Sequence, residues 1–269
     1  MKVLPDTQHI VLEQDGSVLT LWLNQPQARN ALDDVMVAEI HATLDAIRDE
    51  RSIRTLVIRG KGGFFCAGGN LKGFKAGQGA EEVTEETVAH GNRQFGHLLV
   101  KLNEQPQTVI ALVEGAAIGG GLGLACLGDV CIVTRDCKFR LSETSLGIPP
   151  AQIAPFVTER VGLTQARRLM LTGARFKGEE AVQYGLAHIL ADDSDDLERK
   201  CAEVLEQIAS CAPNANAVTK DIIFQSLRLS RPEALDYASR GFAACMLSDE
   251  GKEGITAFVE KRAPAWAAD

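Results

Sequence analysis

The sequence lacks the cysteine and histidine patterns that mark disulfide-stapled domains and structural metal sites. Its seven cysteines are scattered and odd in number, no CxxC pair occurs, and no group of cysteine and histidine has zinc spacing. We therefore expect reduced thiols, a cytoplasmic location and no bound metal. The sequence also contains no internal repeat of fixed period and no low-complexity tract.

An excess of basic residues is missing as well. Lys and Arg number 28 against 36 Asp and Glu, which gives a formal net charge of −8. Phosphate contacts need a basic surface, so this balance argues against a general binder of nucleic acid or anionic membranes. A local cationic patch for a phosphorylated small ligand remains compatible with it.

No run of apolar residues is long enough to predict a membrane span. The longest stretch, around residues 108–127, is interrupted by Glu114 and by several glycines. The first ten residues, MKVLPDTQHI, lack the apolar region of a signal peptide. We therefore expect a soluble protein that does not bind membranes.

The remaining composition is that of an ordinary globular protein. Its 269 residues are 45% hydrophobic and 24% charged, enough to bury one large domain, alone or with an appendage. Two β-rich runs within residues 10–23 flank Asp15-Gly16, which predicts a hairpin with a type I′ turn. Short apolar runs at residues 55–58, 108–113 and 130–133 predict buried strands, the first of them parallel.

Helical patterns surround and follow these strands. Within residues 33–50 apolar side chains recur at spacings of three and four, and a second helix is expected around residues 88–104. From about residue 153 the pattern is mostly helical. The strongest segments there are 194–211, 214–229, 232–247 and 249–262. Strand–helix alternation followed by helices predicts an α/β fold, which we divide into a core (1–200) and a helical C-terminal region (201–269).

Two segments share one design, in which a buried strand runs into glycines and then into a helix. They are TLVIRGKGGFFCAGGNL (55–71) and TVIALVEGAAIGGGLGLA (108–125). Glycines after a strand allow close approach of a ligand and leave amide N–H groups free to point into a cavity. A helix that starts there favours developing negative charge. Two such turns facing each other would form an oxyanion hole.

Two other interpretations explain the glycines of both segments less well than an oxyanion hole does. They are tight turns that bind no ligand and a nucleotide-binding site. One glycine-rich loop alone is more often just a tight turn. Nucleotide binding would require GxGxxG, but Leu124 or Cys126 stands where the last glycine should be, and no GK[ST] occurs.

Five ordered segments across nearly the whole chain resemble the crotonase (enoyl-CoA hydratase/isomerase) superfamily. They are NQPQARNAL (24–32), FCAGGNL (65–71), GAAIGGGLGLA (115–125), FRLSETSLGIPP (139–150) and AFVEKR (257–262). The resemblance implies a crotonase-like spiral of ββα units with a helical C-terminal trimerisation region. It also implies a homotrimer or a hexamer made of two trimers, and an acyl-CoA thioester as substrate with no separate cofactor.

The resemblance also assigns catalytic roles. The family's oxyanion-hole amides fall on Gly69 and Gly120, and its catalytic glutamate falls on Glu143. Burial at the end of an apolar cavity would raise the pKa of Glu143 toward the operating pH, which suits proton transfer. Without the resemblance, Glu143 would be one acidic residue among 36.

Coenzyme A binding is implied in the same way. Ala28, Arg29 and Ala31 resemble the family's cradle for adenosine and pantetheine, together with Ala67 and Gly68. The family's lip falls on Lys72, Phe258 and Lys261, and in many members it closes over the coenzyme A of a neighbouring subunit. Taken alone, Arg29 and Lys261 are exposed charges that need have no function.

The chain departs from the two-glutamate hydratase pattern. Gly123 stands where those hydratases carry a second glutamate, and Asn70 replaces a common aspartate. The segment GIPPAQIAPFV (147–157), together with GGGLGLA and SETSLG, resembles one bacterial branch of the family. That branch hydrates 3-methylglutaconyl-CoA and isohexenylglutaconyl-CoA in leucine and acyclic-terpene degradation. We expect the space at Gly123 to be vacant for a distal substrate carboxylate, with Arg140 or Lys72 as its counter-ion.

These residues predict hydration of an enoyl-CoA. The alternatives are a Δ3,Δ2-enoyl-CoA isomerase, which needs only one base, a non-catalytic acyl-CoA-binding protein, and a coenzyme A thioester hydrolase or dehalogenase. Cys66 could be a nucleophile, although packing of the oxyanion loop explains it better. Asp129 is expected to orient the turn before the next strand.

Overall fold

The structure is a computed structural model that describes residues 3–70 and 84–267. It begins with the expected hairpin, β1 (Ile10–Asp15) paired antiparallel with β2 (Val18–Leu23). The predicted type I′ turn is wrong. The two central residues are Gly16 and Ser17, and only Gly16 has a positive φ, at 51°. Glycine in the first central position with an ordinary second residue is the pattern of a type II′ turn.

The hairpin forms one edge of a six-stranded sheet with the order β1-β2-β3-β4-β6-β9. From β2 onward all neighbours are parallel. The remaining strands are β3 (Thr55–Gly60), β4 (Thr108–Val113), β6 (Val130–Thr134) and β9 (Ile189–Ala191). Three of these confirm the predicted strands, and β3 is parallel as expected.

A second, smaller sheet has the order β5-β7-β8, with strands β5 (Ala116–Ile118), β7 (Lys138–Arg140) and β8 (Arg175–Lys177). The chain visits the two sheets in turn, since β4 leads into β5 and β6 leads into β7. This alternation is the spiral of ββα units that the family resemblance implies. Both β8 and β9 lie where mostly helix was expected, because three-residue strands are too short to show a period.

Helices cover the face of the large sheet that carries the larger core cluster. α1 (Asp34–Ile47) is capped by Asp33, whose carboxylate accepts from Met36 N at 2.9 Å. α3 (Glu85–Asn103) starts three residues earlier than predicted, at a Thr84 capping box. The shorter helices on the core are α4 (Gly120–Ala125), α5 (Ala154–Thr172) and α6 (Gly178–Gln183).

α7 (Ser194–Ala209) covers the opposite face of the large sheet. Its Leu197, Cys201 and Val204 pack with alternate strand residues such as Ile110 and Ile132, whose neighbours point into the larger cluster. The predicted core boundary between residues 200 and 201 falls inside this helix. The chain leaves the core after α7.

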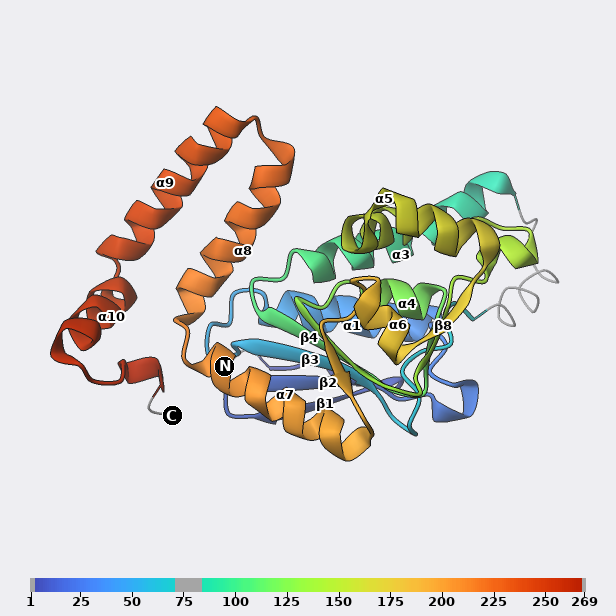
Figure 1. Cartoon of the computed structure of the whole chain (residues 1–269), viewed down its shortest axis with the longest axis horizontal. Coiled ribbons are helices and arrows are strands. Elements are labelled where there is room, and N and C mark those ends of the chain that lie inside the picture. Colours follow the sequence, from blue (N-terminus) through green and yellow to red (C-terminus); the bar gives the residue numbers. More distant parts are fainter. Residues whose placement is uncertain (1–2, 71–83, 268–269) are drawn as a thin grey trace.

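The last three helices form an arm that extends away from the core (Figure 1). They are α8 (Pro213–Arg228), α9 (Arg231–Leu247) and α10 (Asp249–Glu260). All three confirm the predicted segments. Neither α8 nor α9 contains a buried residue.

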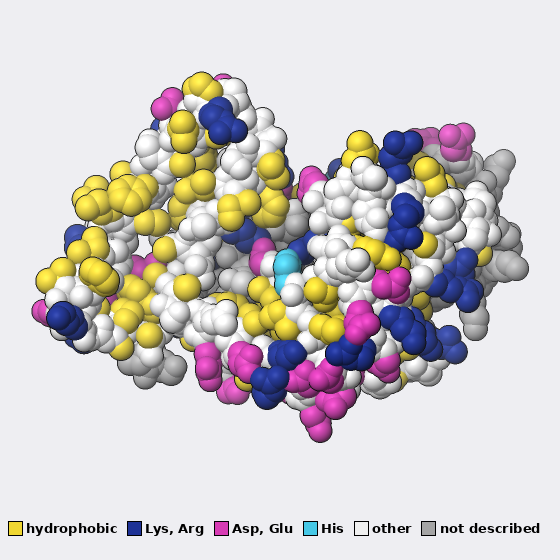
Figure 2. Space-filling view, viewed as in Figure 1, with side chains coloured by type: hydrophobic (Ala, Val, Ile, Leu, Met, Phe, Trp, Pro, Cys, Tyr) yellow, Lys and Arg dark blue, Asp and Glu magenta, His cyan; other side chains and the backbone are white. Residues whose placement is uncertain are grey.

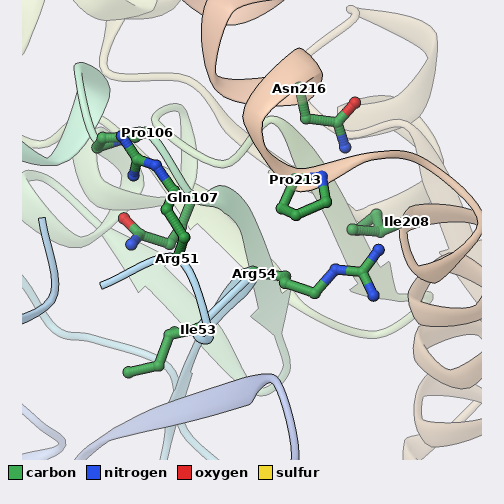
Figure 3. Close-up of a pocket in the computed structure, with 8 residues that line it drawn as sticks. All are labelled: Arg51, Ile53, Arg54, Pro106, Gln107, Ile208, Pro213 and Asn216. Carbon is green, nitrogen blue, oxygen red and sulfur yellow. The ribbon is translucent and has the colours of Figure 1, made fainter. Parts of the chain in front are cut away.

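Arg54 holds the root of the arm. Its guanidinium donates to the carbonyl oxygens of Ala209 at 2.9 Å, Cys211 at 2.7 Å and Trp266 at 2.8 Å. Figure 3 shows this side chain reaching across a small cavity toward Pro213, the first residue of α8. Arg54 therefore ties the root of the arm to the chain just before β3. The ion pairs Lys220–Asp129 and Arg228–Glu104 add contacts between α8 and the core.

Within the two described ranges, no helix is long and apolar enough to cross a bilayer.

Candidate active site

The two glycine-rich turns lie against each other. Phe65 N donates to Glu114 O at 3.0 Å, and Cys66 bridges to Ala117 of β5. Gly68 adopts a φ of 91°, and a Cβ atom added there would lie 2.7 Å from Ile118 O and 3.4 Å from Gly120 N. Only glycine fits at this close approach, so the first turn is held beside the start of α4.

The amides of Gly69 and Gly120 have no hydrogen-bond acceptor among residues 3–70 and 84–267. Gly120 is the first residue of α4, where N–H groups lack an intrahelical partner. Gly69 lies opposite Leu32 in a parallel bridge, which is closed by Leu32 N to Gly68 O and Asn70 N to Leu32 O, each at 2.8 Å. In such a bridge the amide of the central residue points to the other side. Both amides are therefore free to bind an oxyanion.

Glu143 lies beside these amides. It starts a short 3₁₀ helix (Glu143–Leu146), and a Cβ atom added at Gly119 would lie 2.7 Å from its Oε1. Its Oε2 is buried and has no hydrogen-bond partner in the described part of the chain. Burial raises the pKa of Glu143, while the backbone N–H groups of Glu143 and Ser142 partly offset this. The site thus holds a carboxyl group suited to exchange protons.

Local structure fixes where Glu143 stands. Gly119 N donates to Arg140 O at 2.9 Å, which joins β7 to the turn before α4. Leu141 is buried, and Ile148 N donates to Glu143 O at 3.2 Å. Thr144 Oγ1 donates to Met170 O of α5 at 3.0 Å. The carboxylate is therefore positioned by backbone contacts on both sides.

The space beside Gly123 is not vacant, so that prediction is wrong. A Cβ atom at Gly123 would overlap Cγ2 of Ile153 and lie 2.9 Å from its Cβ. Ile153 is 3% exposed. The Arg140 guanidinium donates to Gly173 O and Ser145 Oγ, and no contact brings it to Gly123. Lys72 lies outside the described residues.

The predicted strips for coenzyme A run side by side. Ala67 N donates to Arg29 O at 3.0 Å, next to the bridge between Leu32 and Gly69. Ala28 and Arg29 are exposed, Ala31 is half-buried, and the Arg29 guanidinium lies 5.9 Å from the centre of the Phe64 ring.

Asn30 holds these strips together, a role that sequence reasoning missed. Its buried side chain accepts from Gln25 N at 2.8 Å and donates to Lys61 O at 3.0 Å and to Phe64 O. It therefore joins residues 24–32 to the first glycine turn. The second asparagine of NQPQARNAL, between Arg29 and Ala31, is the signal that could have revealed it.

Comparison with protein families gives the same result as the geometry. Residues 13–269 match the family model described as Enoyl-CoA hydratase/isomerase. The chain belongs to this family. It is therefore a crotonase-superfamily enzyme, and its relatives support the hydro-lyase class.

The curated relatives match over nearly their full length. A "Probable enoyl-CoA hydratase" of Bacillus subtilis is 32% identical and covers 95% of this chain and 97% of its own. A "Carnitinyl-CoA dehydratase" of Proteus mirabilis is also 32% identical, with 97% and 98% covered.

Solved structures of the family have the same fold. One described as "Pseudomonas aeruginosa AtuE" is 51% identical with a TM-score of 0.93, over 97% of this chain and 100% of its own. An enoyl-CoA hydratase/isomerase from Marinobacter aquaeolei is 41% identical with a TM-score of 0.93, over 96% and 99%.

Phe258 and Lys261, which resemble the family's lip over coenzyme A, lie in the arm and do not reach the site of their own chain. Phe258 is 85% exposed on α10, and Lys261 is the exposed residue that ends this helix. Figure 1 places α10 at the opposite end of the molecule from α4 and β8. A role for them at a crotonase site requires a second subunit.

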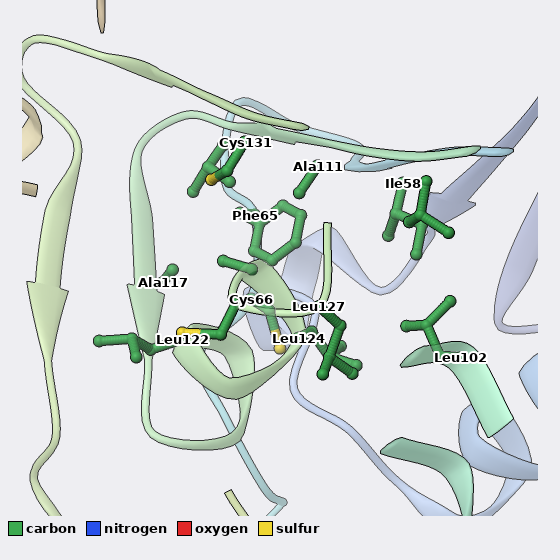
Figure 4. Close-up of a cluster of buried hydrophobic side chains, with 14 of the residues drawn as sticks. Ile58, Phe65, Cys66, Leu102, Ala111, Ala117, Leu122, Leu124, Leu127 and Cys131 are labelled. Carbon is green, nitrogen blue, oxygen red and sulfur yellow. The ribbon is translucent and has the colours of Figure 1, made fainter. Parts of the chain in front are cut away.

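Cys66 is a packing residue of this crotonase fold. Its side chain is buried beside Phe65 and Leu122 (Figure 4), and burial raises the pKa of its thiol to about 12. A thiol with that pKa is not a nucleophile near neutral pH. Asp129 accepts from Val109 N of the neighbouring strand β4 at 2.7 Å and forms an ion pair with Lys220 at 2.7 Å, so it joins its own turn to β4 and to the arm.

Proposed function

We propose that the chain catalyses the reversible addition of water to the double bond of an α,β-unsaturated acyl-CoA. The amides of Gly69 and Gly120 bind the thioester oxygen and draw charge onto it, which makes the β-carbon electrophilic. Glu143 takes a proton from water as its oxygen bonds to the β-carbon, and a proton is returned to the α-carbon. Backbone amides and one carboxyl group supply this chemistry, with coenzyme A as part of the substrate and no further cofactor.

The observation that carries this proposal is the buried, unpartnered Oε2 of Glu143 beside two amides without acceptors. Buried polar atoms in folded proteins nearly always have partners. Donors and an acceptor left open in one place are therefore suited to a ligand that needs both. A thioester oxygen and a water molecule meet that need.

We propose a glutaconyl-type acyl group, such as 3-methylglutaconyl or isohexenylglutaconyl, as the substrate, with a place in leucine or acyclic-terpene degradation. The support is the sequence resemblance in residues 115–125 and 139–157. Ile153 packs against Gly123, so an apolar side chain takes the place of the second glutamate.

The test is a panel of enoyl-CoA thioesters, straight and branched, with and without a terminal carboxylate, assayed in ¹⁸O-labelled water. Hydration of the branched carboxylated thioesters, with ¹⁸O in the product, is the expected result. Equal rates on glutaconyl and crotonyl thioesters would remove the substrate proposal and leave the hydratase. Absence of ¹⁸O from every product would remove the hydratase as well.

A Δ3,Δ2-enoyl-CoA isomerase is the second candidate, and Gly123 favours it. Moving one proton between two carbons needs one base, and Glu143 has no second carboxylate at position 123. Isomerisation adds no water, so double-bond migration without ¹⁸O would identify it. A free-thiol assay for released coenzyme A separates both reactions from thioester hydrolysis, and a bound thioester without any turnover would indicate a binding protein.

We propose that the arm assembles the chain into a homotrimer or a hexamer of two trimers. Figure 2 shows apolar side chains gathered over the arm, where Leu227, Phe242 and Leu247 are each about 70% exposed. Apolar patches of this kind mark protein–protein contacts. Light scattering after size-exclusion chromatography measures the mass, and a monomer at micromolar concentration would contradict assembly.

We also propose a cytoplasmic location. Seven free cysteines support a reducing compartment of this kind.

A further inference from the structure

One face of α3 forms a wall of the site beside the oxyanion amide. A Cβ atom added at Gly120 would lie 3.3 Å from Cζ of Phe95 and 3.4 Å from Cδ1 of Leu32. Phe95 is half-buried and packs against the core. The acyl chain of a thioester bound at the Gly120 amide therefore meets apolar side chains first.

Polar groups gather at the next residue of the same helix. Gly96 is buried, and a Cβ atom there would overlap Oε1 of Gln152 and lie 2.7 Å from Nη1 of Arg93. Gln152 Nε2 also donates to Asn92 Oδ1 at 2.9 Å. Because Gly96 has no side chain, a guanidinium and two amides share one place on the surface of α3.

The residues from Glu143 to Ile153 bring this polar cluster to the reacting groups. This segment starts at the Glu143 carboxylate, which lies against Gly119, and ends at Ile153, which lies against Gly123. Gln152 immediately precedes Ile153 and contacts α3. These contacts join the start of α4, the face of α3 and residues 143–153, with the Arg93 guanidinium on the α3 side.

Arg93 has no carboxylate partner within residues 3–70 and 84–267, whereas other arginines such as Arg135, Arg228 and Arg262 form ion pairs. A guanidinium binds a carboxylate through two parallel N–H donors, which gives both affinity and orientation. Asn92 and Gln152 can add amide donors beside it.

We propose that Arg93, supported by Asn92 and Gln152, binds a carboxylate at the far end of the substrate's acyl chain. This inference rests on the proposed function for the position of the thioester. It assigns the counter-ion to a residue of α3 in place of Arg140, whose guanidinium donates to Gly173 O and Ser145 Oγ. Arg93 is then the residue that distinguishes dicarboxylic acyl groups from plain ones.

The test measures binding of two saturated thioesters, glutaryl-CoA and butyryl-CoA, by calorimetry to the full-length protein. Wild type is expected to prefer glutaryl-CoA. Arg93→Met should reduce that preference about 10-fold to 100-fold, since one charge-assisted pair is lost. Arg93→Lys should retain part of it. Gly96→Ala, which favours the helix but pushes Arg93 and Gln152 aside, should reduce it without changing any charge.

Arg167→Met is the matched control, because Arg167 is an exposed arginine of α5 without a contact to the site. No preference in wild type, or an unchanged preference in Arg93→Met, would overturn the inference. So would loss of the preference in Arg140→Met alone. Saturated thioesters cannot be hydrated, so a failed hydration assay with an Arg93-dependent preference would count against the proposed reaction only.

Discussion

The core and the arm use apolar residues in opposite ways. In the core, strand and helix side chains such as Leu56, Leu122 and Phe139 are at most 1% exposed. In the arm, Leu227, Phe242 and Leu247 are 71%, 67% and 72% exposed, although α8 and α9 are regular helices of 16 and 17 residues. Helices of this kind do not stabilise themselves in isolation, because most helix stability comes from packing of an apolar face. The core folds around its own side chains, whereas the arm leaves its apolar side chains uncovered within one chain.

The site follows this division. Gly69, Gly120 and Glu143 are positioned by backbone contacts within the core, whereas Phe258 and Lys261 belong to the arm. Changes in the core should therefore alter chemistry without altering assembly, and changes on the apolar surface of the arm should alter assembly first.

The largest effect is expected at Glu143. Glu143→Gln keeps the shape of the side chain and removes its ability to exchange protons, so kcat for hydration should fall about 10²-fold to 10⁴-fold. The oligomer mass should not change. Glu206→Gln, at an exposed position on α7, is the matched control. A fall of less than 10-fold in Glu143→Gln would mean that another group carries the proton.

The second effect concerns the arm. Phe242→Asp combined with Leu247→Asp places two charges on its apolar surface, and association should weaken at least about 100-fold, since each buried side chain contributes about 1.5–3 kcal/mol. Sedimentation velocity over a dilution series measures this. Ser239→Asp adds a charge to the same helix at a polar position and should have no effect. Unchanged assembly in the double variant would show that the arm is not the interface.

The third effect tests the contact between a glycine and the catalytic carboxylate. Gly119→Ala should lower kcat about 10-fold to 100-fold, because its Cβ would lie 2.7 Å from Glu143 Oε1 and its φ of 52° is unfavourable for alanine. Gly16→Ala has a similar φ of 51° and no atom within 4 Å of its added Cβ. If both variants lose the same activity, backbone strain rather than displacement of Glu143 is the cause.

The fourth effect is a pH dependence of stability. The pKa of Glu143 is raised in the folded state, so the native state binds more protons than the unfolded state and ionisation of Glu143 opposes folding. Glu143→Gln should therefore be more stable than wild type at pH 7 to 8. The difference should vanish as the pH falls below the ordinary carboxyl value of 4.5. Urea unfolding at each pH measures it, and a Glu143→Gln variant less stable than wild type at pH 8 would contradict burial as the cause.

The smallest effect is expected at a contact between the core and the arm. Lys220 of α8 forms a half-buried ion pair with Asp129 of the core at 2.7 Å. Lys220→Met should lower the free energy of unfolding by about 1 kcal/mol or less, as for other ion pairs with partial solvent access. Arg240→Met, an exposed arginine on α9, is its control in the same denaturation experiment. A loss above about 3 kcal/mol would mean that the pair behaves as a buried one.

The sequence alone predicts the parts of this molecule that depend on neighbours along the chain. Strands such as residues 108–113 are predicted by runs of apolar residues. Helix α1 is predicted by apolar residues that recur every three or four positions, and the two turns are predicted by their many glycines. Glu143 was found by its place in a family pattern, not by a local signal. Its burial and unpartnered oxygen became visible only in the structure.

What could not be predicted depends on residues far apart in the sequence. Gly123 looked like an empty place, and Ile153, thirty positions later, fills it. No local pattern in the sequence marks Gly96, which makes room for Gln152 and Arg93. Such contacts follow from how elements pack, which no local pattern records.

Arg54 has a consequence for how the chain matures. It binds carbonyl groups at the end of α7 and at Trp266, which is 212 residues later in the sequence. During synthesis the guanidinium therefore emerges from the ribosome long before its last acceptor exists. The core can close first, and the root of the arm acquires all of its contacts with Arg54 only after Trp266 has emerged.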